Sequence, residues 1–201
     1  MFASIVRTYQ CSEFFKNLFK FLIFAKYKYN AILKYTQTHI AFTLLSALAC
    51  LLFFSHDGYC ADDPCVDPVA EICEKYGKPL FIHSGHPPFS LPWQIGLLAE
   101  RHPHLPIVMI HMGHAHGVYV DAAITMAKKY DNIWLETSGT SMSIQIANAY
   151  NTVGHEKVMF GIDSPFHAPT VEIQKIMACG VDDEGLENIF YHNAAKFMGL
   201  K

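Results

Sequence analysis

Four apolar segments recur along the chain at a nearly constant interval, and each ends at a polar residue. The segments are 79–82, 106–110, 132–135 and 157–162, and the residues that close them are His83, His111, Glu136 and Asp163. Continuous apolar runs of this length are typical of strands covered on both faces in a parallel sheet. The closing residues are 28, 25 and 27 positions apart, which is the spacing of successive βα units with short loops. The chain is therefore predicted to be an α/β protein.

The segments between these strands have helical periodicity. Helices are expected over 68–76, 93–101, 119–130 and 144–153. Alternating strands and helices suit both a (β/α)8 TIM barrel and a doubly wound sheet. The chain contains neither G-x-G-x-x-G nor G-x-x-x-x-G-K-[ST], which bind nucleotide phosphates. TIM barrels build their active sites at the C-terminal strand ends, so the polar residues there favour a barrel, of which four units make half.

The first 60 residues differ from the rest. Residues 40–54 are almost entirely apolar, with basic residues such as Lys34 before them and acidic residues such as Asp57 after them. We therefore expect two parts: residues 1–60, an apolar helical segment that acts as a membrane anchor or signal-like region, and residues 61–201, the enzyme-like part. This predicts a membrane-anchored or exported protein, or a cytoplasmic one if the first segment is a gene-model or fusion artefact.

The charge balance bears on the kind of partner. The chain has 15 Lys and Arg against 18 Asp and Glu, a net charge of -3, and no basic tract in its later region. Binding to the phosphate backbone of a nucleic acid is therefore not expected. A small-molecule substrate is the expected partner.

Three of the residues that close strands are candidate metal ligands: His83, His111 and Asp163. A neutral imidazole is a good ligand for zinc or a similar divalent ion, and zinc is the expected cofactor. His111 can act either as a ligand or as the group that polarises a reacting carbonyl. Asp163 follows an apolar strand, where a carboxylate needs a cation or hydrogen bonds, so it is expected to bind metal or to accept a proton. His111 and Asp163 are the expected catalytic residues.

Other polar residues near the strand ends have weaker assignments. Glu136 is expected to hold its loop or the neighbouring histidines rather than to act in catalysis directly. His86 and His114 lie in the adjoining loops and are candidates for substrate binding. His102 and His104 form an H-x-H pair, but they lie before a predicted strand, at the wrong end for a barrel site, and are expected on the surface.

Five stretches resemble the amidohydrolase-related (amidohydrolase 2) family, which includes aminocarboxymuconate semialdehyde decarboxylase. They are PLFIHSG, LLAERHPHLPIVMIHMGH, AKKYDNIWLETSG, VMFGIDSPF and NIFYHNAAKFMGL, and they cover about residues 62–201. The resemblance implies the last four βα units of a TIM barrel. It also implies that His83 is the metal ligand of the fifth barrel strand, His111 the sixth-strand histidine and Asp163 the eighth-strand acid.

The chain departs from the family pattern because no H-x-H pair precedes His83. Half a barrel has open strand edges, so a complementary half-barrel or a homo-oligomer is an expected partner. The first expected activity is hydrolysis, in which Asp163 accepts a proton from a metal-activated water that attacks a carbonyl-type bond. The alternatives are non-oxidative decarboxylation by the same residues, and a non-catalytic fragment or membrane-tethered interaction protein.

Overall fold

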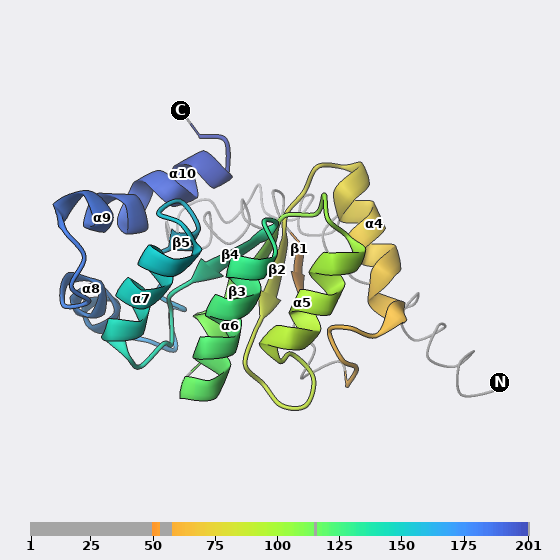
Figure 1. The fold of residues 1–201 in the computed structure, drawn as a ribbon, viewed down its shortest axis with the longest axis horizontal. Helices are drawn as coiled ribbons and strands as arrows, with labels where there is room; N and C mark the ends of the chain where they lie inside the picture. Colours follow the sequence, from red (N-terminus) through yellow and green to blue (C-terminus); the bar gives the residue numbers. More distant parts are fainter. Residues whose placement is uncertain (1–49, 53–57, 115, 201) are drawn as a thin grey trace, which may run out of the picture.

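A computed structural model describes residues 50–52, 58–114 and 116–200, and its centre is a five-stranded parallel sheet (Figure 1). The strands are β1 (Cys50–Leu52), β2 (Leu80–His83), β3 (Ile107–Ile110), β4 (Ile133–Glu136) and β5 (Val158–Met159). They lie in the order β1-β2-β3-β4-β5, so each strand pairs with the next along the chain. A doubly wound sheet reverses its strand order at a switch point, and no reversal occurs among these strands.

An α-helix separates each of these strands from the next, and further helices follow the last strand. The helices are α4 (Asp67–Lys75), α5 (Pro92–Arg101), α6 (Gly117–Lys129), α7 (Ser143–Val153), α8 (Pro169–Met177), α9 (Asp183–Glu187) and α10 (Asn193–Phe197). Short 3-10 turns occupy Pro64–Val66 and His111–Gly113, and a π-helical turn occupies Asn188–His192. Figure 1 shows α4, α5, α6 and α7 side by side on one face of the sheet, as in part of a TIM barrel. The predicted partial barrel is confirmed.

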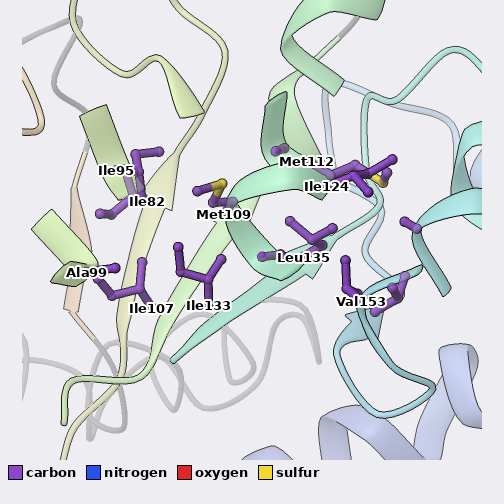
Figure 2. Packing of buried hydrophobic residues seen from close by; sticks show 14 of the residues in the cluster. Ile82, Ile95, Ala99, Ile107, Met109, Met112, Ile124, Ile133, Leu135 and Val153 are labelled. Atoms are coloured by element: carbon purple, nitrogen blue, oxygen red, sulfur yellow. The ribbon is translucent and has the colours of Figure 1, made fainter. Parts of the chain in front are cut away.

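The core lies between the sheet and these four helices. Because side chains alternate along a strand, Ile82, Ile107, Met109, Ile133 and Leu135 all point to the helical face (Figure 2). They meet apolar residues on the inner sides of the helices, which include Ile95, Ala99, Ile124 and Val153. Burial of one such aliphatic side chain stabilises the fold by about 1.5–3 kcal/mol relative to leaving it exposed.

Three aromatic rings meet at the opposite face of the sheet. Phe81 of β2 and Trp134 of β4 alternate with the core residues and so point away from α4–α7. Phe197 of α10 contacts both, with ring centroids 6.2 Å from Phe81 and 4.9 Å from Trp134. The last helix therefore packs against the face that would line the interior of a barrel.

The strand β1 corrects the expectation for the N-terminal part. Residues 50–52 lie inside the apolar run 40–54, which was predicted to be helical, yet they pair in parallel with Leu80–Ile82. A continuous apolar run suits a buried strand as well as a helix, and periodicity alone does not separate the two. The rest of that run and the candidate anchor in residues 1–49 lie outside the described residues. The part of the chain that the structure describes holds no helix both long and apolar enough to cross a membrane.

Two further expectations are wrong. The fourth predicted strand was to reach Ile162, but β5 ends at Met159, because the Phe160 N–H donates to Ile189 O (2.9 Å) instead of continuing the sheet. His102 was expected on the surface, but it is buried, with its Nε2 3.1 Å from Asp67 Oδ1 and its Nδ1 3.5 Å from Glu74 Oε2. His104 is exposed, as expected.

Candidate active site

The predicted site residues gather at the C-terminal edge of the sheet. His83 and Glu136 are the last residues of β2 and β4, and His111 directly follows β3. Asp163 lies four residues beyond the end of β5. Parallel strands end at the same edge, so their terminal side chains share one region of the molecule.

The backbone at this edge adopts conformations that side chains rarely occupy. Non-glycine residues with positive φ in the described part of the chain are all found here: His111 (68°), Met112 (34°), His114 (65°) and Asp163 (46°). Such conformations cost on the order of 1–3 kcal/mol each and persist only where surrounding contacts enforce them. The turn after β3 is enforced by Ser84, whose hydroxyl donates to Ile110 O (2.6 Å) and accepts from the Gly113 N–H (2.9 Å).

Four imidazole rings form a cluster. The ring centroid of His83 lies 4.4 Å from the ring centroids of both His86 and His111. The ring centroid of His114 lies 4.9 Å from that of His86 and 5.4 Å from that of His111. Burial lowers the pKa of His86 and of His114, and the neighbouring His111 lowers both further. For His114 the nearby Asp163 opposes this shift in pKa without reversing it. Both rings are therefore biased towards the neutral form, in which each offers one N–H donor and one acceptor nitrogen.

Glu136 accepts hydrogen bonds that fix His111. Its Oε2 accepts from the His111 N–H (3.0 Å) and from the Ser138 hydroxyl (2.7 Å), and its Oε1 accepts from the Ser138 N–H (2.9 Å). The Ser138 hydroxyl has one proton, which it donates in the hydrogen bond to the Glu136 carboxylate. Nδ1 of His111 lies 2.9 Å from both Ser138 O and Ser138 Oγ, so this nitrogen must be the donor. The other ring nitrogen, Nε2, then carries a lone pair in the neutral ring.

That lone pair faces a second acceptor. His111 Nε2 lies 3.9 Å from Asp163 Oδ2, and His167 Nε2 lies 3.9 Å from the same oxygen. His111 is buried, with 1% of its side chain exposed, whereas Asp163 is 33% exposed and so reachable from solvent. A carboxylate and an imidazole lone pair attract each other only through a proton or a cation. The arrangement suits either proton transfer or cation binding.

The fit of this site to a metal ion is partial. Imidazole nitrogen and carboxylate oxygen are the donors that divalent ions such as zinc and manganese take in proteins. Within the described residues, however, no three His, Cys, Asp or Glu side chains are grouped so that they could hold an ion together. His111 and Asp163 thus offer two adjacent ligand atoms, and any further ligands would be water or groups outside the described residues.

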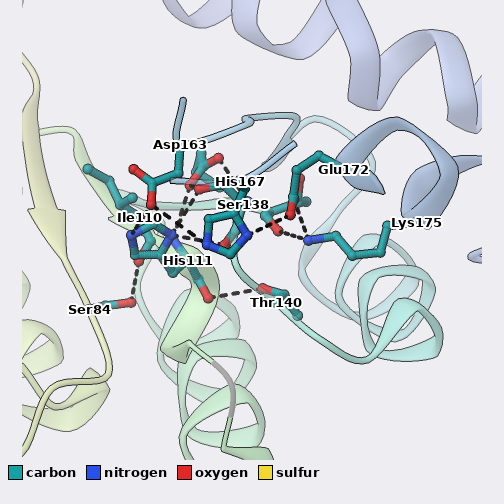
Figure 3. A network of polar contacts seen from close by, with 11 residues as sticks. Ser84, Ile110, His111, Ser138, Thr140, Asp163, His167, Glu172 and Lys175 are labelled. Carbon is teal, nitrogen blue, oxygen red and sulfur yellow. Dashed lines mark hydrogen bonds and ion pairs between the residues drawn. The ribbon is translucent and has the colours of Figure 1, made fainter. Parts of the chain in front are cut away.

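A second polar network adjoins the first (Figure 3), and two of its members, Glu172 and Lys175, were not identified from the sequence as part of the site. Nδ1 of His167 lies 3.2 Å from Oε1 of Glu172, and Glu172 also pairs with Lys175. Lys175 Nζ donates to Thr137 O (3.1 Å) in the loop after β4. The sequence holds only a weak signal for this network, because Glu and Lys three residues apart usually mark an exposed helix face.

Two glycines are required by close packing at the site. At Gly85, φ is +85° and an added Cβ would lie 2.3 Å from Gly113 O, so only glycine allows this close turn after His83. At Gly161, an added Cβ would lie 1.5 Å from Oε1 of Glu136. Gly161 therefore leaves the space that the Glu136 carboxylate occupies.

Comparison with known proteins gives the family and a relative. A family model described as amidohydrolase matches residues 46–200. The chain is 26% identical over 181 residues to a 2-amino-3-carboxymuconate-6-semialdehyde decarboxylase from Dictyostelium discoideum, and the match covers 69% of this chain and 50% of that protein. The chain thus spans about half the length of the curated relative that it matches.

Solved structures share the fold. An uncharacterised TIM-barrel protein from Bordetella bronchiseptica has a TM-score of 0.61 at 19% identity and is matched over 70% of this chain and 52% of its own. A 5-carboxyvanillate decarboxylase from Sphingomonas paucimobilis has a TM-score of 0.59 at 20% identity, with 77% and 59% covered. A dihydroxybenzoic acid decarboxylase from Polaromonas, with bound manganese and 2-nitroresorcinol, has a TM-score of 0.52 at 15% identity, with 70% and 55% covered.

The matching stretch contains every predicted site residue, from His83 to Asp163, and it begins before β1. The resemblance inferred from the sequence motifs is confirmed, and the strand order and the solved structures agree on a partial TIM barrel. The chain belongs to the amidohydrolase family.

Proposed function

We propose that this chain carries the site of a metal-dependent lyase that releases carbon dioxide from a carboxylated aromatic or similar unsaturated acid. The observation that carries the proposal is the pair of acceptors at the strand ends, His111 Nε2 facing Asp163 Oδ2 at 3.9 Å. The names of the similar proteins support it, because the curated relative and two of the three solved structures described above are decarboxylases.

Non-oxidative decarboxylation needs one proton at the carbon that loses its carboxylate. The C–C bond breaks, carbon dioxide leaves, and the electron pair of that bond ends as a C–H bond. In the proposed reaction Asp163 holds and delivers this proton, because one of its two carboxylate oxygens can carry it while the other binds the ion. His111 is suited to bind the ion because the Glu136–Ser138 contacts leave its Nε2, and not its Nδ1, towards the site.

Substrate binding is assigned to His86 and His114. Nε2 of His86 is buried and has no hydrogen-bond partner among the described residues. An unsatisfied buried polar atom costs about 1–3 kcal/mol, which an oxygen of a bound acid would recover. Since burial biases both rings towards the neutral form, they would bind a carboxylate or phenol oxygen through N–H donors.

A divalent ion is part of the proposal, with His111 and Asp163 as the described residues that would hold it. His83, the third ligand expected from the sequence, lies beside His111 with ring centroids 4.4 Å apart but is not grouped with these two residues around a shared ion. When bound, such an ion neutralises the negative charge of the acid substrate and orients it. Zinc was the expectation from the sequence, whereas the Polaromonas decarboxylase structure contains manganese. Both ions suit imidazole and carboxylate donors, so both belong in the test.

The test is an incubation of the full chain with manganese or zinc and with 2,6-dihydroxybenzoate or 5-carboxyvanillate in D2O. We expect carbon dioxide, and one deuterium at the ring carbon that carried the carboxylate. His111→Gln and Asp163→Asn should abolish the release, whereas His104→Gln, at an exposed histidine before β3, should leave it unchanged. No release with either ion and either acid would count against the proposal for these substrates.

Hydrolysis is the second candidate function, because the matching family model is described as amidohydrolase. Water labelled with ¹⁸O separates the two reactions. A hydrolase places the label in its organic product, whereas the proposed lyase does not. A folded protein that neither binds a divalent ion nor turns over an acid or an amide would instead support a non-catalytic role.

A further inference from the structure

We propose that Glu172 and Lys175 of α8 are positioning residues, which tie together the two loops that carry the polar groups of the site. These loops are 137–142, after β4, and 160–168, after β5. The inference rests on the proposed function for its importance, since it concerns the same site. The contacts of α8 from which we infer it do not depend on the proposed function.

Glu172 is an unusual residue because its side chain is only 2% exposed. A buried carboxylate is tolerated when both oxygens find partners. Its Oε1 lies 3.2 Å from Nδ1 of His167, and its Oε2 pairs with Lys175. Glu172 therefore holds a ring from the loop after β5, the ring whose other nitrogen lies 3.9 Å from Asp163 Oδ2.

Lys175 extends this connection to the loop after β4. It is 11% exposed, and its Nζ donates to Thr137 O at 3.1 Å. The next residue, Ser138, holds Nδ1 of His111. One ion pair on one helix thus contacts the peptide that orients His111 and the ring beside Asp163 (Figure 3).

The geometry fixes a tautomer at His167. A carboxylate only accepts hydrogen bonds, so the ring nitrogen that faces Glu172 is the one expected to carry the proton. In the neutral ring Nε2 then has a lone pair directed towards Asp163. With both rings neutral and Asp163 ionised, three acceptors converge here without a donor among them: His111 Nε2, His167 Nε2 and Asp163 Oδ2.

The test begins with the wild-type protein. A long-range ¹H–¹⁵N correlation spectrum at a pH where His167 is neutral reports which of its ring nitrogens carries the proton. We expect Nδ1–H. An Nε2–H ring would overturn the proposal, and this measurement needs neither substrate nor metal.

The second arm separates positioning from stability. Removing one partner of a buried ion pair destabilises a protein, whereas replacing both with apolar residues of similar size is often neutral. In the double variant Glu172→Met/Lys175→Met, we therefore expect a melting temperature close to that of the wild type but changed ring signals for His167 and His111. Unchanged signals for both rings would overturn the proposal. If this variant does not fold, Glu172→Gln, which keeps the size of the side chain, should shift the His167 signals in the same experiment.

The matched control is a second Glu–Lys pair in the described part of the chain, Glu156 with Lys196, whose side chains are 61% and 72% exposed. Glu156→Met/Lys196→Met should leave both histidine signals as they are. Where the chain proves active, Glu172→Met/Lys175→Met should lower kcat by about 10- to 100-fold, as loss of supporting contacts does at metal sites, with little change in KM. The expected tautomer in an inactive protein would refute the proposed function and leave the positioning role intact.

Discussion

Replacement of Gly161 by alanine should disrupt the site through Glu136. The added Cβ would lie 1.5 Å from Oε1 of Glu136 and 2.5 Å from its Cδ, so the carboxylate has to move. The moved carboxylate loses at least the hydrogen bond from the Ser138 N–H at 2.9 Å. Loss of the Ser138 hydroxyl contact as well would free His111 to adopt its other tautomer.

The expected change in stability is a difference of two terms. A hydrogen bond to a charged group contributes about 1.5–3 kcal/mol. The φ angle of Gly161 is not in the left-handed region. At such a position, replacing glycine with alanine stabilises a protein by about 0.4–1 kcal/mol, because it lowers the conformational entropy of the unfolded chain. Gly161→Ala should therefore lower the free energy of unfolding by about 1–2 kcal/mol if one hydrogen bond is lost, and by more if all three contacts of Glu136 are lost. For a chain of this size, each kcal/mol lowers the melting temperature by about 2–4 °C.

The assay is urea unfolding, together with the long-range ¹H–¹⁵N correlation spectrum of the His111 ring. Gly117→Ala is the matched control, because φ at Gly117 is also outside the left-handed region and the added Cβ meets only Met142 Cε at 3.6 Å. The control should be as stable as the wild type or slightly more so. A Gly161→Ala protein that is as stable as the control, with an unchanged His111 spectrum, would refute the reasoning.

Two further predictions follow from single carboxylates. Glu136→Gln leaves one oxygen and one NH2 group where three donors point, so it should lower the free energy of unfolding in urea by about 1.5–3 kcal/mol. Glu187→Gln, at a 75% exposed position, should leave the free energy of unfolding almost unchanged. Equal decreases in both variants would contradict the account. Asp67 lies deep enough for burial to raise its pKa, but hydrogen bonds from Arg101 and His102 outweigh burial and lower the pKa below its usual value. Its contribution to stability should thus be present above about pH 4, the ordinary pKa of an unfolded aspartate, and be lost as the pH falls through the lower folded value. The difference in free energy of unfolding between wild type and Asp67→Asn should shrink over that acidic range, and a difference that grows there would contradict the assignment.

The sequence predicts the centre of the fold well because apolar runs and helical periodicity report burial directly. The strands β2, β3 and β4 and the helices α4 to α7 agree with the sequence pattern to within two residues at each end. Polar residues after such strands must meet at one edge in any parallel sheet, which is why the gathering of His83, His111, Glu136 and Asp163 was predictable.

What the pattern missed depends on contacts between distant residues. Cys50–Leu52 lie in an apolar run that fits a helix or a strand, and only pairing with β2 makes them a strand. Glu172 and Lys175 look like an exposed helical pair until the loop after β4 places Thr137 O beside Lys175. His102 looked like a surface residue because its partners Asp67 and Glu74 are about 30 residues away in the chain.

Calorimetric titration of the full chain with manganese and with zinc tests the central claim most directly, since the proposed lyase needs a divalent ion at the strand-end site. The account predicts one ion per chain, and an affinity at least about tenfold weaker in Asp163→Asn and in His111→Gln, because even supporting contacts at metal sites are worth 10- to 100-fold. His104→Gln, at the exposed histidine before β3, should bind like the wild type. No binding of either ion, or binding that Asp163→Asn and His111→Gln leave unchanged, would contradict the account.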